Sequence, residues 1–145
     1  DRSMVGGMKE EAFRPLIRTQ SELEQLWRRL MAPLGFSGHT LWMVVIQDDR
    51  PVPQIMEIVD ASDTPEDDDV TAFARVLEHL ASPDTRFAFL RSRPGAGRPD
   101  ALDRAWARAL HDAGRRSGAA VDLVHLAHDH DVLPIVLDDL LAEPA

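Results

Sequence analysis

Hydrophobic and polar positions along the chain alternate between helix-like and strand-like spacing. The first stripe has the period of one helix face: Leu23, Leu26, Trp27, Leu30 and Met31. Ser21 and Glu24, three residues apart, predict a capping box at its start, and Pro33 with Gly35 ends it. The pattern predicts a helix over residues 20–35.

Two strand-like stretches follow this helix. Residues 41–46 form a continuous apolar run that is too short for a buried helix and is typical of a central strand. A polar turn at 47–50 leads into residues 52–59, which predict a second strand pairing back as an antiparallel hairpin. Pro51 and Pro53 suit only a strand start or a sheet edge.

An acidic stretch at 60–69 precedes the next helical pattern. Its spacing does not match an EF-hand loop, so we interpret the acids as helix-start residues favoured by the helix dipole. Thr64 as cap and Pro65 at the first helical position predict a helix over 65–80. The expected inward residues are Val70, Phe73, Ala74, Leu77 and Leu80.

The third unit is a short core strand at 87–90, a Pro/Gly-rich loop at 91–99 and a long amphipathic helix. Asp100 and Asp103 predict its capping box, and Gly118 is placed to end it. The apolar stripe of this helix is Leu102, Trp106, Ala109, Leu110 and Ala113.

The remaining chain predicts a strand at 121–127, a turn at 128–131, a strand at 132–137 and a short terminal helix from Asp138. The order α-β-β-α-β-α-β-β-α predicts an α/β protein, with a three-layer α-β-α arrangement around a mixed sheet. We expect a single domain over 1–145, with a loose N-terminal segment at 1–19.

The composition of the chain indicates which class of protein it belongs to. The chain has 145 residues, 44% hydrophobic and 28% charged, which is typical of a globular domain. The formal charge of -9 argues against nucleic-acid binding. Cysteine is absent, and no apolar run has the length of a membrane helix, so we expect a cytoplasmic protein with no membrane partner.

Two short motifs flank the Pro/Gly-rich loop: Arg91-Ser92-Arg93-Pro94 and Asp100-Ala101-Leu102-Asp103. With the element order from Leu41 to Leu137, they resemble the RadC-like branch of the JAB/MPN metalloprotease superfamily, where His-x-His-Pro and Ser-x-x-Asp stand at these places. The resemblance implies a RadC/JAB-like, cytidine-deaminase-like core over 41–137 with an extra N-terminal helix.

The resemblance also implies a lost activity. In the family, two imidazoles and a carboxylate hold Zn²⁺, and a Glu on an earlier strand is the general base. Here both imidazole positions are arginine, which offers a metal no lone pair; Asp103 remains, and Gln54 or Glu57 falls near the base position. We therefore expect no catalytic residues, no metal and no cofactor. The resemblance implies a small bacterial-type, non-catalytic module for binding or scaffolding. Its partner would be an unknown protein or a second copy of the chain, in a homodimer.

Residues 86–116 contain eight arginines and three acidic residues in an otherwise acidic chain. Arg91, Arg93 and Arg98, next to the helix start at Asp103, predict an anion- or nucleotide-binding site. The alternative is that these arginines pair internally with Asp100, Asp103 and the acids at 63–69.

The most metal-like cluster is His128-Asp129-His130-Asp131, with His125 nearby. If the strand continued, His128 and His130 would share one face, so His125, His128 and His130 with Asp103 are candidates for a rearranged metal-dependent hydrolase. The alternative is a polar hairpin turn without a metal.

Overall fold

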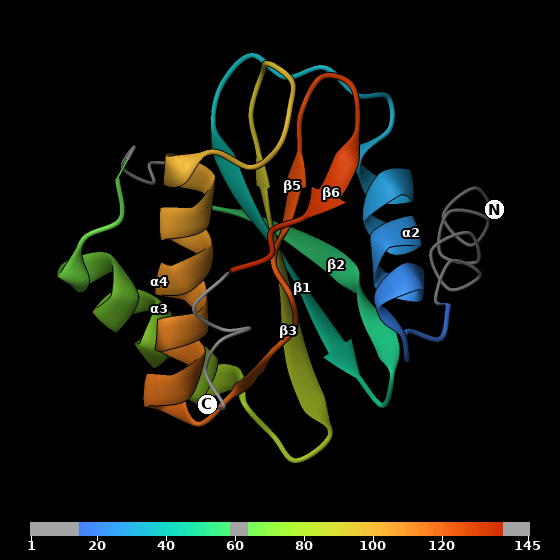
Figure 1. The fold of residues 1–145 in the computed structure, drawn as a ribbon. Helices are drawn as coiled ribbons and strands as arrows, with labels where there is room; N and C mark the ends of the chain where they lie inside the picture. The colour runs from blue at the N-terminus through green and yellow to red at the C-terminus, as the bar shows by residue number, and fades with distance from the viewer. Residues whose placement is uncertain (1–14, 59–63, 138–145) are drawn as a thin grey trace, which may run out of the picture.

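A computed structural model describes residues 15–58 and 64–137. It is a mixed α/β protein in which one sheet lies between helices (Figure 1). Helix α2 (Gln20–Met31) covers one face, while α3 (Asp67–Leu80) and α4 (Ala101–Ser117) cover the other. The prediction of a mixed sheet with helices on both faces is confirmed.

The sheet has six strands: β1 (Thr40–Gln47), β2 (Arg50–Ile58), β3 (Thr85–Ser92), β4 (Ala120–Val121), β5 (His125–Ala127) and β6 (Val132–Pro134). Their order is β2-β1-β3-β5-β6, and β4 pairs with the other half of β3. Strand β3 runs antiparallel to β1 and parallel to β4 and β5. It has neighbours on both sides, which explains its almost entirely buried sequence.

The predicted hairpin joins β1 and β2. Asp48 and Asp49 both have positive φ, 53° and 64°, and such a turn matches the twist of the two strands. The register shifts between Val44 and Ile46, so β2 bends. Strand β2 is the sheet edge, as Pro51 and Pro53 require.

The cap of helix α2 (Gln20–Met31) lies two residues earlier than its sequence pattern suggested. The cap is Thr19, whose Oγ1 accepts from the backbone N–H of Glu22 while the Glu22 carboxylate accepts from Thr19 N–H. The prediction that Ser21 and Glu24 form this box was wrong, because Thr19 is the last extended residue and Ser21 already lies inside the helix. The helix ends at Met31 rather than at residue 35.

Helix α3 is shorter than predicted. Glu66, not Thr64, is the extended cap residue, and its backbone N–H donates to the Asp69 carboxylate at 2.8 Å. Phe73 reaches the core edge-on against Phe89 and Trp106. Leu80 was expected to point inward but is 38% exposed at the last helical position.

The predicted capping box of α4 is confirmed: Asp100 accepts from Asp103 N–H, and Asp103 accepts from Asp100 N–H. The helix ends at Gly118, where φ of +74° favours glycine.

The strand predicted at 121–127 is broken into β4 and β5. The chain leaves the ladder at Asp122, whose carboxylate turns to the side chain of Arg86. The strand predicted at 132–137 pairs only as far as Pro134, although Ile135 and Leu137 are buried. The helix predicted from Asp138 lies outside the described residues.

Residues 15–19 differ from the loose segment expected at 1–19. Ile17 is only 1% exposed, and its N–H donates to Asp49 O. In the described ranges, none of the helices combines the length and the apolar character needed to span a membrane.

A test of this packing is available at Gly114, on the buried side of α4. A Cβ there would lie 2.6 Å from Cγ2 of Val121 and 3.3 Å from Ala119 O. Although alanine is the better helix former by about 1 kcal/mol, Gly114→Ala is expected to lower the free energy of unfolding by about 1–3 kcal/mol. Urea denaturation measures it.

The control is Gly114→Ala in a Val121→Ala background, which removes the methyl group that clashes. If the substitution at Gly114 costs as much in that background as in the parent, contact with Val121 is not the cause.

Candidate functional site

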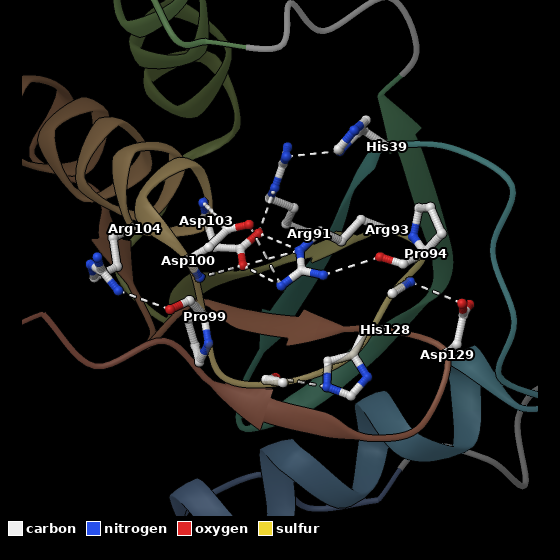
Figure 2. A network of polar contacts seen from close by, with 12 residues as sticks. His39, Arg91, Arg93, Pro94, Pro99, Asp100, Asp103, Arg104, His128 and Asp129 are labelled. Atoms are coloured by element: carbon white, nitrogen blue, oxygen red, sulfur yellow. Dashed lines mark hydrogen bonds and ion pairs between the residues drawn. The ribbon is translucent and has the colours of Figure 1, made fainter.

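The candidate site is an ion cluster of Arg91, Arg93 and Asp103, where β3 ends and α4 begins (Figure 2). Arg91 is opposite Leu41 in the β1–β3 ladder, and Leu41 belongs to the core on the α3/α4 side. Residues two apart on a strand share a face, so Arg91 and Arg93 both project towards α4. The three side chains are buried, at 2%, 7% and 0% exposed.

Asp103 is the centre of the cluster. Its Oδ1 accepts from Arg91 Nε at 2.9 Å and from Arg93 Nε at 3.0 Å. Its Oδ2 accepts from Arg93 Nη2 at 2.8 Å and from the backbone N–H of Asp100 at 2.8 Å. A helix-capping carboxylate is thus also the counter-charge for two strand arginines.

Arg93 is the more fully compensated of the two arginines. It binds both oxygens of Asp103, its Nη1 donates to Pro94 O at 3.1 Å, and its Nη2 lies 3.9 Å from the Asp100 carboxylate. The hydrogen bonds to Asp103 raise the pKa of Arg93 further above its usual range.

Arg91 has one carboxylate oxygen and one imidazole. Besides its bond to Asp103, its Nη2 lies 2.8 Å from Nδ1 of His39, an exposed residue just before β1. Because a guanidinium only donates, His39 Nδ1 accepts here, and the ring is neutral in this arrangement.

The electrostatics of Asp103 combine opposing effects. Burial alone raises the pKa of this carboxyl group, but hydrogen bonds from Arg93, from Asp100 N–H and from Arg91 together hold the pKa below its usual value of 3.8. Asp103 is therefore ionised at neutral pH despite being buried.

The loop from Pro94 to Pro99 is exposed, yet its backbone is fixed from several sides. His128 Nε2 lies 2.9 Å from Gly97 O, to which it is hydrogen-bonded. The backbone N–H of Asp129 donates to Gly95 O, and the backbone N–H of Gly95 donates to the Asp129 carboxylate. The other oxygen of Asp129 accepts from Phe36 N–H at 2.9 Å. The 128–131 turn therefore connects two neighbouring loops.

The histidine residues are not arranged as a metal site. His128 Nδ1 accepts from His130 N–H, so both ring nitrogens of His128 are used. His125 lies opposite Leu90 on the α2 side of the sheet, with Nδ1 3.2 Å from Leu123 O; burial lowers the pKa of His125. Among residues 15–58 and 64–137, no group of three His, Asp or Glu side chains is placed to hold an ion.

The other predicted site residues lie apart. Arg98 is exposed in the loop and is not part of the ion cluster. Glu57 is opposite Trp42 in the β1–β2 ladder, and Trp42 packs on the α2 side, so Glu57 and the arginines lie on opposite faces. Gln54 lines a small pocket between α2 and β2.

Internal pairing of the arginines was one of the two alternatives from the sequence. Arg91 and Arg93 do pair internally, with Asp103 and, for Arg93 at 3.9 Å, with Asp100. The acidic stretch contributes elsewhere, through a bond from Arg116 to Asp67. Sequence analysis did not single out His39, which lies 52 positions before its partner Arg91, or the bonds from Asp129 to the loops at Phe36 and Gly95.

Comparison of the chain with protein-family models, with curated proteins and with solved structures finds no match. What can be said of function therefore depends on the site itself.

Asp103→Asn tests the ion cluster. Both carboxylate oxygens only accept, so an amide NH₂ at either position would face an N–H donor. Loss of the negative charge leaves two buried arginines without a counter-charge. The free energy of unfolding, measured by urea denaturation, is therefore expected to fall by about 3–5 kcal/mol. Asp100→Asn, which keeps a good cap, should cost less than about 0.5 kcal/mol; equal losses for the two variants would contradict this assignment.

Acid denaturation gives a second test. Because the folded-state pKa of Asp103 is below 3.8, its contribution to stability is complete above that pH and is lost as pH falls through the folded-state pKa. Stability measured between about pH 5 and pH 2 should fall less steeply in Asp103→Asn than in the parent protein. Parallel curves would show that Asp103 does not contribute to acid lability.

Proposed function

We propose that this chain is a non-catalytic domain with a RadC/JAB-like fold, in which an internal ion cluster occupies the place of the metal, and that it acts as a binding or scaffolding module. The observation that carries the proposal is the convergence of Arg91, Arg93 and Asp103. These are the residues at the two imidazole positions and the carboxylate position of the resemblance, and they meet at one point.

The geometry of the meeting point supports the proposal in detail. Nε of Arg91 and Nε of Arg93 approach the same oxygen of Asp103, at 2.9 and 3.0 Å. A metal with two imidazole ligands and one carboxylate ligand needs the same three directions to converge. In this chain the positive charge is supplied by the protein, so the constellation contributes to stability instead of activating water.

The chemistry of the cluster favours a structural role. Arginine stays protonated and has no lone pair for a metal, and Asp103 has its oxygens engaged by four donor groups. The candidate base Glu57 lies on the other face of the sheet. Among residues 15–58 and 64–137, no group of metal ligands and general base is therefore found around Asp103.

The fixed loop at 94–99 offers the module a recognition surface. Its backbone is held by His128, Asp129 and Arg93, while Arg98 remains exposed. A loop that is rigid before it meets a partner loses little conformational entropy on binding. The partner in this proposal is another protein or a second copy of the chain.

The proposal predicts that a metal site can be restored. An imidazole nitrogen lies about as far along a side chain as the Nε of arginine, so Arg91→His with Arg93→His should create a site with Asp103. After gel filtration in the presence of zinc, we expect about one zinc per chain in the double variant and none in the parent, measured by elemental mass spectrometry.

The matched control adds Asp103→Asn to the double variant and should lose the metal. A folded double variant, judged by circular dichroism, that binds no zinc would contradict the proposed relation to the metalloprotease fold. Zinc-dependent hydrolysis of a peptide or isopeptide by the parent protein would contradict the non-catalytic role.

A further inference from the structure

Among residues 15–58 and 64–137, the charges around Arg91 are not balanced. The ion cluster has two guanidinium groups and one buried carboxylate, and the only additional acid found in range within these residues, Asp100, is 3.9 Å from Arg93. A buried charge is costly unless it is paired, so it matters which arginine carries the positive charge that Asp103 does not neutralise. This charge lies on Arg91, which shares a single oxygen of Asp103 with Arg93.

Among the described residues, the outer end of Arg91 has only a neutral partner. Its Nη2 donates to His39 Nδ1 at 2.8 Å, whereas Nη1 takes part in no bond found within the described ranges. Figure 2 shows the guanidinium of Arg91 extending away from Asp103 towards the ring of His39. A planar pair of N–H groups at this end matches the two oxygens of a carboxylate or a phosphate.

Within the described part of the chain, His39 is the only side chain found to hydrogen-bond this end, and it is exposed. Arg91 itself is 2% exposed, so a ligand that takes the place of the imidazole requires rotation of the His39 ring. An exposed side chain before the first strand can rotate without disturbing the core.

We propose that Arg91 and His39 form an oxyanion-binding site, in which the carboxylate or phosphate group of a ligand takes the place of the imidazole against Nη1 and Nη2 of Arg91. The site does not depend on the family resemblance, since it follows from the charge of the cluster and from the exposure of its neutral partner. It also differs from the sequence-based anion site, because Arg93 is closed by Asp103 and Arg98 lies outside the cluster.

The test uses two variants at His39. In both Asn and Asp the side-chain oxygen lies at the same branch position as His Nδ1. His39→Asn therefore keeps a neutral acceptor for Arg91, and His39→Asp adds the missing negative charge. We expect the thermal midpoint of His39→Asp to exceed that of His39→Asn by at least about 3 °C in a buffer without oxyanions.

The ligand half of the test uses inorganic phosphate and acetate as probes, with sodium chloride at equal ionic strength as the control. We expect one or both probes to raise the thermal midpoint of the parent and of His39→Asn, and to have no effect beyond the chloride control on His39→Asp. A larger rise of the thermal midpoint with phosphate than with acetate indicates a phosphate ligand, and the reverse indicates a carboxylate ligand.

A spectroscopic readout locates the effect. In the parent, the Nε–H signal of Arg91 should shift on titration with the active probe in NMR, while the signal of Arg104 on α4 should not. Absence of any probe-specific stabilisation in the parent, or equal midpoints for His39→Asp and His39→Asn, would overturn the proposal.

Discussion

A single buried carboxylate connects the start of α4 to the end of the central strand β3. Asp103 starts a helix by accepting from Asp100 N–H, and the same two oxygens neutralise arginines on the central strand. Burial works against the charged state, and three sets of donors outweigh burial. The angle at which α4 leaves the sheet is therefore tied to an electrostatic requirement as well as to apolar packing around Trp106.

The opposite end of the sheet has its own arginine. Arg86 binds Asp49 and Asp122, and thereby joins the β1–β2 turn to the chain after β4. Between these ends, two apolar clusters fill the space on either side of β3. The two polar networks define where the strand begins and ends, whereas the apolar residues hold the layers together.

Local signals in the sequence were sufficient for much of this arrangement. The apolar run of β1, the hairpin and the Asp100–Asp103 box each depend on residues close together in the chain. A prediction was wrong by two residues where two nearby hydroxyl side chains can both cap a helix, as Thr19 and Ser21 can. The pairing of Arg91 with His39 depends on the register of β1 against β3, in which Thr40 lies opposite Ser92, and nothing in the local sequence encodes that register.

The strand order β2-β1-β3-β5-β6 ends on each side in a strand that contains proline: Pro51 and Pro53 in β2, and Pro134 in β6. Proline lacks the N–H that an incoming strand would need, so these borders are poor templates for further backbone pairing. The stretch from Gln54 to Ile58 is the longest part of either border without one. Residues 54–58 are therefore the part of these two strands best suited to backbone pairing with another strand.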